Sequence, residues 1–405
     1  QASDVSAMSK PAGCGAALPD CGRRRAPSNH DAISRKEGLI VKLTYVTRVN
    51  VPGRAAQSLQ IEHMARAFHA ELTDDFRLIA SRPKGLVAAR NFPLEWLVAT
   101  NRPSRPLNYF RFLVAGLRAA RYGPVFTRDI AIAFAIVVTG GQVLYEMHRQ
   151  PETGTARRLT RWLAGKRNIG FVSISQALAD FYIAEYGLSD RQVHVAHDGA
   201  FVEDSSLPDP VERKAILREL GLPQDKIILL HSGSVYKGGA ELFGHLAAPF
   251  GERALLVHVG GKDEQLALWR RKYADCGNVE LRSQVSSEIA RKYQLAADYL
   301  LYINTRNNPI YWCTSPLKLF EYMATGLPII GADIGSVGEV LNDSNAFCFD
   351  PDDLGSIRRA IEKAMQDPEE AQRRATRARQ QIEEEYSWYR RARGILEFAE
   401  RMKAK

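Results

Sequence analysis

The chain has 405 residues, 45% of them hydrophobic. A chain of this length usually folds around more than one hydrophobic core, so two domains are expected. Five cysteines, an odd number without paired spacing, argue against a zinc site and a disulfide framework and fit the reducing cytoplasm. The net charge of +9 is uneven, because nine basic residues fall between Arg82 and Asp129. Such a stretch attracts the phosphates of nucleic acid or of an anionic membrane, unless it is an ordinary solvated surface.

The first 38 residues are rich in Ala, Ser, Pro and Gly and lack the apolar core of a signal peptide. We therefore expect residues 1–38 to be a disordered extension of a cytoplasmic protein. The longest apolar run, Ile130–Val138, has about half of the ~20 residues that a membrane-spanning helix needs. It predicts a buried strand or helix.

Strands and helices are expected to alternate from residue 39 onward. Residues 39–46 are rich in β-forming residues, and a loop with Pro52 and Gly53 leads from them to a helix over residues 55–72. Further strands are predicted over 76–80, 143–146, 170–174 and 193–196, with helices over 107–120 and 176–186. This alternation predicts a parallel sheet covered by helices on both faces.

A second alternating series follows the polar, proline-containing segment 205–210. Its strands are predicted over 227–231, 255–259, 279–281, 299–303, 328–332 and 346–349. A charged helical tail then breaks near Asp367-Pro368 and near Tyr386.

The pattern predicts an α/β chain of two doubly wound Rossmann-like domains facing a cleft. The expected limits are 39–204 for the first domain, 205–385 for the second, and 386–405 for a helix that returns to the first. The ligand is expected in the cleft between the domains.

The most specific pattern lies between Ser315 and Gly326, where a loop opens a helix that a glycine ends. The helix N-terminus offers unpaired N–H groups to a diphosphate, and Lys318 adds a full positive charge. Glu321, one turn later, can accept hydrogen bonds from two ribose hydroxyls. Its alternative role is an exposed acid paired with Lys318.

This segment closely resembles the signature of GT-B glycosyltransferases of family 4, and the resemblance covers most of the chain from about residue 39. The loop after residues 227–231 is similar to the family's phosphate loop. Lys237 matches the family's lysine there, and Ser234 stands where many members have arginine. The resemblance implies these nucleotide-sugar-binding residues: Gly53, Gly233, Lys237, Ser315, Lys318 and Glu321.

Two further positions follow from the resemblance. Residues 144–148 resemble the strand end that carries the family's active-site histidine, so His148 is the catalytic candidate, with a purely structural histidine as the alternative. The family's glutamate eight residues before the ribose-binding one is Cys313 here. This departure concerns the sugar site and leaves the nucleotide site intact.

The resemblance implies a retaining glycosyltransferase that moves a sugar from a nucleotide diphospho-sugar, with a UDP-sugar favoured, to an acceptor hydroxyl in polysaccharide or glycolipid synthesis. The expected partners are this donor, a lipid-linked or saccharide acceptor and an anionic membrane surface on the cytoplasmic side, with no nucleic acid. Two alternatives share the nucleotide site: a GT-B nucleotide-sugar epimerase and a non-catalytic nucleotide-sugar-binding module.

No metal and no other cofactor is expected, because lysines and a helix end can meet the charge of the departing diphosphate. Asp350-Pro351-Asp352 has the form of a D-x-D metal motif, but its place after a late strand indicates a turn. The glycine fingerprint of dinucleotide-binding domains and the P-loop are both missing from the sequence, which argues against redox chemistry and P-loop hydrolysis.

Overall fold

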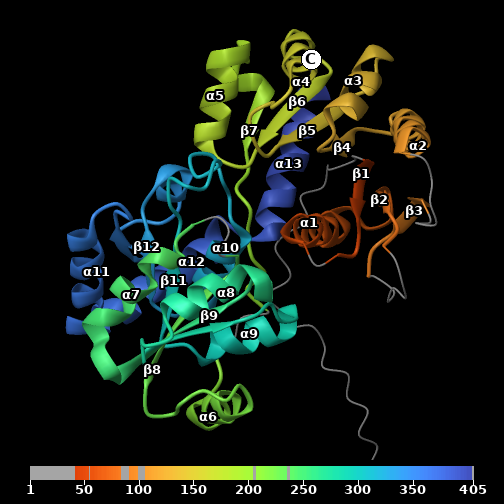
Figure 1. The fold of residues 1–405 in the computed structure, drawn as a ribbon. Coiled ribbons are helices and arrows are strands. Elements are labelled where there is room, and N and C mark those ends of the chain that lie inside the picture. The colour runs from red at the N-terminus through yellow and green to blue at the C-terminus, as the bar shows by residue number, and fades with distance from the viewer. Residues whose placement is uncertain are drawn as a thin grey trace, which may run out of the picture. The chain divides into compact units, whose positions relative to one another are not determined.

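The computed structural model describes residues 42–53, 55–83, 91–98, 105–203, 207–234 and 238–403. The expected disordered extension over residues 1–38 lies outside these ranges, and so does Lys237. Within them, strands and helices alternate and build two parallel sheets with helices packed on them (Figure 1). The predicted architecture of two doubly wound Rossmann-like domains is confirmed.

Seven parallel strands form the sheet of the first domain, in the order β3-β2-β1-β4-β5-β6-β7. They are β1 (Leu43–Asn50), β2 (Phe76–Ser81), β3 (Leu94–Val98), β4 (Val125–Thr127), β5 (Val143–Met147), β6 (Ile169–Ser173) and β7 (Val193–Val195). The helices between them are α1 (Ala56–Leu72), α2 (Arg105–Ala119), α3 (Ile130–Val138), α4 (Gly154–Ala164) and α5 (Gln176–Tyr186). Leu43, Tyr45 and Val46 on β1 are all buried, as expected for a parallel strand with helices on both faces.

Six parallel strands form the second sheet, in the order β10-β9-β8-β11-β12-β13. They are β8 (Ile227–Ser232), β9 (Ala254–Val259), β10 (Val279–Arg282), β11 (Tyr299–Tyr302), β12 (Ile329–Ala332) and β13 (Phe347–Phe349). The helices are α6 (Pro210–Glu219), α7 (Phe243–Ala247), α8 (Asp263–Lys272), α9 (Ser287–Ala296), α10 (Leu317–Thr325), α11 (Leu354–Gln366) and α12 (Pro368–Glu384). The strand order reverses between β8 and β11, and doubly wound sheets bind ligands at such a point.

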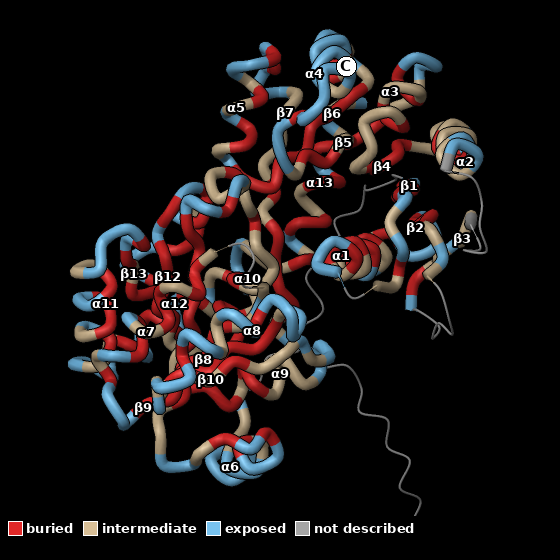
Figure 2. Tube along the Cα trace, viewed as in Figure 1, coloured by how far each residue is buried: buried red, intermediate tan, exposed pale blue. Residues whose placement is uncertain are grey.

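Burial follows the layers of each sheet. The strands of both sheets are largely buried, and the exposed residues lie mostly on the outer faces of the helices and in loops (Figure 2). In β9 every residue is buried, including one polar side chain, His258. A buried polar side chain in a continuous apolar strand needs a hydrogen-bond partner, and Nε2 of His258 lies 3.0 Å from the carbonyl oxygen of Gly260.

The last helix, α13 (Trp388–Lys403), packs on α1 and β6 of the first domain (Figure 1). Gly170 on β6 makes room for it, because a Cβ there would lie 2.4 Å from the sulfur of Met402 and 2.6 Å from the ring of Phe398. Trp388, at the start of the helix, is fully buried. The exact domain limits given above stay a prediction.

The structure resolves one open choice and adds two strands that the sequence did not predict. Ile130–Val138 is the helix α3, whose N-terminus is capped by the Asp129 carboxylate accepting hydrogen bonds from two backbone N–H groups. The unpredicted strands are β3 and β4. Strand β4 has only three residues, too few to show a periodic pattern.

In the described part of the basic stretch between Arg82 and Asp129, not every basic residue lies on an outer surface. Arg128 lies in a pocket with only 12% of its side chain exposed, and Phe112 is buried in the core. Phe110 on α2, in contrast, is 61% exposed. Within the described residues, no helix is long and apolar enough to cross a membrane.

Candidate functional site

A pocket of about 1050 Å³ is lined by residues of both sheets. The first domain contributes Tyr145 and Glu146 at the carboxyl end of β5, and the second contributes His231 and Ser232 at the carboxyl end of β8. Ligands of doubly wound proteins bind at these strand ends. The volume lies at the upper end of the range for pockets that hold small ligands and cofactors.

Of the seven residues assigned to the site from the sequence, five line this pocket: His148, Gly233, Ser315, Lys318 and Glu321. Lys237 lies outside the described residues. Gly53 is not among the lining residues; a Cβ there would lie 2.5 Å from the hydroxyl of Ser58, so this glycine allows the loop to approach α1 closely.

Glycines bring the backbone close to the pocket on the second-domain side. Gly233, just after β8, has φ +126°, and a Cβ there would lie 3.1 Å from the amine of Lys318. A Cβ on Gly260, after β9, would lie 1.9 Å from the carbonyl oxygen of Gly233. Side chains at either position would disturb the loop, because Gly233 leaves room for the Lys318 side chain and Gly260 lets its backbone approach that of Gly233.

Lys318 is the second residue of α10 and is held at the end of β8. Its amine donates a hydrogen bond of 2.7 Å to the carbonyl oxygen of Ser232 and lies 3.2 Å from Nε2 of His231. It also lies 5.4 Å from the centroid of the Tyr302 ring. The N-cap residue of α10 is Pro316, which provides no side-chain cap. This helix terminus and the lysine together favour an anionic group in the pocket.

Glu321 lies one turn further along α10 and is half-buried. Its carboxylate accepts a hydrogen bond of 3.3 Å from the side-chain amide of Gln294. Burial raises its pKa, although Gln294 and Arg291 act in the opposite direction. Helix α10 ends as expected, with Gly326 in the left-handed conformation at φ +74°.

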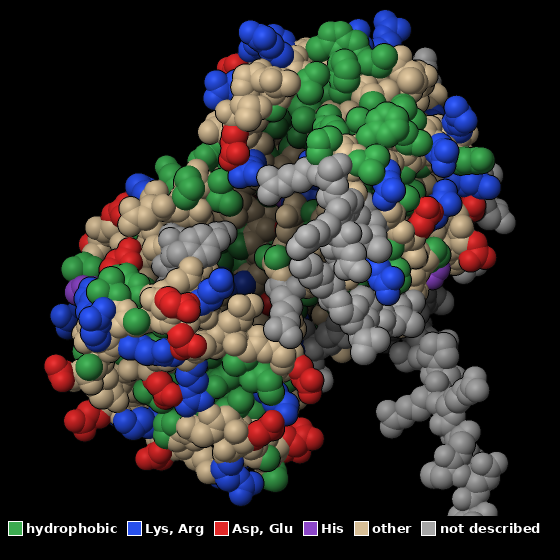
Figure 3. Space-filling model, turned by 45° about the vertical axis from the view of Figure 1, so that its right-hand side comes forward, with side chains coloured by type: hydrophobic (Ala, Val, Ile, Leu, Met, Phe, Trp, Pro, Cys, Tyr) green, Lys and Arg blue, Asp and Glu red, His purple; other side chains and the backbone are tan. Residues whose placement is uncertain are grey.

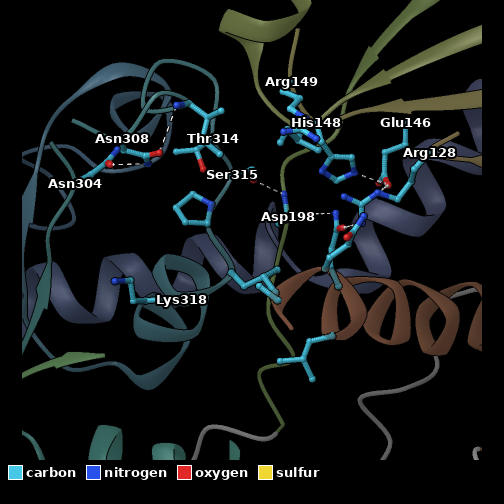
Figure 4. Close-up of a pocket in the computed structure, with 18 of the residues that line it drawn as sticks. Arg128, Glu146, His148, Arg149, Asp198, Asn304, Asn308, Thr314, Ser315 and Lys318 are labelled. Atoms are coloured by element: carbon cyan, nitrogen blue, oxygen red, sulfur yellow. Dashed lines mark hydrogen bonds and ion pairs between the residues drawn. The ribbon is translucent and has the colours of Figure 1, made fainter. Parts of the chain in front are cut away.

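The first-domain side of the pocket is a buried network of charged groups around Glu146 (Figure 4). The Glu146 carboxylate lies 2.8 Å from Nε2 of His148, 2.8 Å from the guanidinium of Arg391 and 3.6 Å from that of Arg128. Arg391 belongs to α13, at the other end of the chain. Of this group, only His148 was predicted from the sequence.

The network fixes the protonation of His148. Although burial raises the pKa of Glu146, His148 and Arg391 hold it well below its usual range. Burial and Arg128 lower the pKa of His148 to about 4, although Glu146 acts in the opposite direction. The imidazole is therefore neutral at neutral pH, and its Nε2–H donates to the Glu146 carboxylate. Its Nδ1 is then an acceptor, suited to receive a hydrogen bond from a hydroxyl group.

Asp198 connects this network to the second domain. Its carboxylate accepts a hydrogen bond of 2.7 Å from the side chain of Gln60 and lies 3.7 Å from Arg391. Its backbone N–H donates to the hydroxyl of Ser315 at 2.8 Å. Burial raises the pKa of Asp198 to about 6, with Arg391 acting in the opposite direction.

Cys313, which stands where the resemblance implied a glutamate, is not among the residues that line the pocket. Cys313 is fully buried against the apolar core of the first domain, and burial raises the pKa of its thiol to about 12. Two amides, Asn304 and Asn308, line the pocket on the second-domain side (Figure 4). Asn304 Oδ1 accepts from Asn308 at 3.1 Å, whereas Asn304 Nδ2 is buried and has no hydrogen-bond partner within the described part of the chain.

Within the described ranges, no group of three or more His, Cys, Asp or Glu side chains is placed to hold a metal ion. The D-x-D segment forms a turn after β13, in which the Asp350 carboxylate accepts from the backbone N–H of Asp352 at 3.0 Å. Asp352 also forms an ion pair of 2.9 Å with Arg306.

Comparison with known proteins links the second domain to a family. Residues 245–397 match the family described as glycosyl transferase-like. The chain is 34% identical over 73 residues to a glycogen synthase of Mycobacterium tuberculosis. That match spans 18% of this chain and 18% of the synthase.

Solved structures match nearly the whole chain. HepE from Anabaena, in complex with UDP-glucose, has a TM-score of 0.70 at 16% identity, covering 90% of this chain and 100% of HepE. WaaG, a glycosyltransferase involved in lipopolysaccharide biosynthesis, has a TM-score of 0.64 at 14% identity, covering 88% and 98%. Sucrose-phosphate synthase from Thermosynechococcus elongatus has a TM-score of 0.68 at 16% identity, covering 89% and 99%. The expected GT-B architecture is confirmed.

Proposed function

On the basis of a GT-B fold whose second domain matches the glycosyl transferase-like family, we propose that this protein is a glycosyltransferase with a nucleotide diphospho-sugar as donor. One observation carries the proposal: Lys318, at a helix N-terminus, and His148, at a strand end, line the same pocket from different domains. The Lys318 side of the pocket suits a diphosphate, and the His148 side suits the sugar and the acceptor hydroxyl.

The proposed reaction transfers the sugar with retention of its anomeric configuration. The bond between the anomeric carbon and the diphosphate oxygen breaks, and the acceptor oxygen forms its bond to that carbon on the same face. The acceptor's proton passes to the departing diphosphate. Lys318 and the N-terminus of α10 stabilise the charge that develops on the diphosphate, without a metal ion.

The donor is proposed to be a UDP-sugar, because HepE of the same fold binds UDP-glucose. Glu321 accepts hydrogen bonds from the ribose hydroxyls, because its half-buried carboxylate lines the pocket one helical turn beyond Lys318. Asn304 faces the sugar in place of the acid lost at Cys313. Its Nδ2, for which the described residues provide no hydrogen-bond partner, donates to a sugar oxygen.

The decisive experiment is a donor screen. The purified chain is incubated with radiolabelled UDP-glucose, UDP-galactose, UDP-N-acetylglucosamine and UDP-glucuronate, with and without a membrane extract as acceptor source. Labelled product that depends on the extract, with release of UDP, supports transfer. Release of an epimerised nucleotide sugar without acceptor identifies an epimerase, and binding without turnover identifies a binding module. Either outcome overturns the proposal.

We further propose that the acceptor is lipid-linked or part of a growing polysaccharide, and that the first domain binds the cytoplasmic face of a membrane. Hydrophobic side chains gather on this domain, with Lys and Arg side chains around them (Figure 3). The most exposed apolar side chains on α2, α3 and α4 are Leu107, Phe110, Val138 and Trp162, at 40–61% exposure. Apolar residues among basic ones suit a headgroup region.

Vesicle flotation tests this part separately. We expect the protein to float with anionic vesicles at low salt, and Phe110→Ser together with Trp162→Ser to weaken this binding. The matched control is Leu268→Ser, at an exposed apolar position of α8 in the other domain. Equal recovery with neutral and anionic vesicles, together with full activity on a soluble acceptor, contradicts membrane association and leaves the transferase proposal standing.

A further inference from the structure

Two buried histidines lie directly behind Lys318. His231 on β8 and His258 on β9 are paired in the parallel register and are 4% and 0% exposed. Their Nδ1 atoms are 2.8 Å apart, and the ring of Phe243 lies against both, with centroid distances of 5.4 and 5.3 Å. His258 is fully buried, and His231 reaches the pocket with only 4% of its surface, so hydrogen bonds within the protein should account for the ring protons of both.

The direction of these hydrogen bonds follows from one fixed acceptor. Nε2 of His258 lies 3.0 Å from the carbonyl oxygen of Gly260, which can only accept, so this nitrogen carries a hydrogen. If His258 is neutral, its Nδ1 is an acceptor, and the Nδ1 of His231 must donate to it. His231 then has an unprotonated Nε2, which accepts from the amine of Lys318 at 3.2 Å.

In the alternative protonation state, His258 carries the proton that Lys318 has lost. The hydrogen bonds between Lys318 and His231 and between His231 and His258 then both run in the opposite direction. That state places an imidazolium in the core. Burial holds the pKa of His231 well below its usual value and lowers that of His258 to about 4, in both cases with help from Lys318. A lysine is a far stronger base than an imidazole, so the proton stays on Lys318.

We propose that His231 and His258 are positioning residues, which form an uncharged hydrogen-bond relay from Gly260 to Lys318 and hold the lysine's ammonium against the donor's diphosphate. The inference rests on the proposed function for the identity of the ligand. Ser232 fixes the ammonium from a second direction through its carbonyl oxygen, at 2.7 Å. The relay thus fixes the position of the Lys318 ammonium without adding a second charge to the pocket.

Imidazole ¹⁵N chemical shifts test the relay in the unliganded protein. We expect His231 as the Nδ1–H tautomer and His258 as the Nε2–H tautomer, both without titration between pH 5.5 and pH 8.5. A protonated ring at either position at neutral pH, or Nε2–H on both, overturns the relay. This measurement is independent of any nucleotide, so it stands even if the proposed function fails.

Binding measurements test the consequence for Lys318. His258→Phe removes the acceptor of His231, and we expect it to raise the Kd for UDP at least about threefold while leaving that for uridine unchanged, since uridine lacks the diphosphate. In the Lys318→Ala background, His258→Phe should have no further effect on UDP. The matched control is His245→Gln, at an exposed position of α7, which should alter neither.

The outcomes separate the two proposals. Weakening of UDP and uridine to the same extent means a general structural role for His258 and overturns the positioning role. The same holds if His258→Phe weakens UDP equally with and without Lys318. Failure of the wild-type protein to bind UDP contradicts the proposed donor instead.

Discussion

The two walls of the pocket are built in opposite ways. On the first-domain wall, Arg128, Glu146, His148 and Arg391 already satisfy one another in a buried network. On the second-domain wall, the groups facing the pocket include a glycine loop and a helix N-terminus without a side-chain cap. They also include Asn304 Nδ2, which has no hydrogen-bond partner among the described residues. The first wall holds its geometry without a ligand, whereas the second offers hydrogen bonds that a ligand completes. Substitutions on the first wall should therefore affect folding and chemistry, and those on the second should affect binding.

The largest expected effect is on stability, from Glu146→Gln. Removing this carboxylate leaves the guanidinium groups of Arg391 and Arg128 without their buried counter-charge, which should lower the free energy of unfolding by about 3–5 kcal/mol in urea denaturation. The control is Glu152→Gln, whose 61%-exposed carboxylate pairs with Arg149 at the surface. That change should cost less than about 1 kcal/mol. Equal effects of the two substitutions would contradict the view of the first wall as a prebuilt network.

The next largest effect is on turnover, from His148→Ala. Loss of the neutral imidazole, whose Nδ1 accepts a hydrogen bond from a hydroxyl group of a bound substrate, should lower kcat by about 10²–10³-fold. UDP should bind with unchanged Kd, because the histidine lies on the opposite wall from the nucleotide. Steady-state kinetics and calorimetry measure the two quantities. A parallel loss of UDP affinity would place His148 in the nucleotide site instead.

On the second wall, Lys318→Ala and Glu321→Ala should each weaken UDP-sugar binding by about 1.5–3 kcal/mol, because each removes a charge-assisted hydrogen bond. Calorimetry gives the affinity, and urea denaturation should show near wild-type stability. Lys272→Ala, which removes an exposed lysine from α8, is the control for lost charge. If both variants keep wild-type affinity, the nucleotide site has been assigned to the wrong helix.

A smaller effect is a pH dependence specific to the first wall. Because burial raises the pKa of Asp198 to about 6, the folded state favours the protonated acid and loses stability as the pH rises from about 4 to about 6. The free energy of unfolding of Asp198→Asn, relative to that of the wild type, should therefore rise by about 1–3 kcal/mol between pH 4 and pH 7. Asp225→Asn, at an exposed position, should show much less change. A constant difference for Asp198→Asn across this range would mean that the carboxylate is charged throughout.

The smallest expected effect comes from metal removal. EDTA should leave transferase activity unchanged, because Lys318 and the N-terminus of α10 meet the charge of the leaving diphosphate. Activity is measured as released UDP before and after chelation. Complete loss that Mn²⁺ or Mg²⁺ restores would direct attention to Asp350 and Asp352, and would show that the second wall needs a cation as well as a ligand.

Most of the fold was predictable because parallel strands leave short apolar runs between helical patterns. Residues 255–259 and 329–332, for example, are buried strands that the sequence marks clearly. Strand β4 could not be predicted, since three residues after Gly123-Pro124 show no period. The run 130–138 stayed ambiguous because uniform apolarity fits both a buried strand and a buried helix, and the Asp129 cap decided in favour of the helix.

The sequence predicted most of the described second wall of the candidate site, but only His148 of the network on the first wall. On the second wall the loop, Lys318, Glu321 and Gly326 are close in sequence, so a motif can contain them. The first wall combines residues as distant as Gln60 and Arg391, and no local pattern joins them. One signal was present: Glu146 precedes His148 by two residues, which places both side chains on one face of an extended strand. The histidine pair was hidden for the same reason, since 27 residues separate two histidines that the sheet brings together.

Because α13 packs on the first domain but is made after the second domain, the first domain is completed late in synthesis. Arg391 is 245 residues further along the chain than Glu146, whose carboxylate it pairs with. At about 5–20 residues per second, a ribosome needs about 10–50 s to make that stretch. During synthesis the strands of the first sheet are therefore made before Arg391, whose guanidinium pairs with the buried Glu146 carboxylate. The whole second domain is made in that interval, so the wall that carries His148 is completed last.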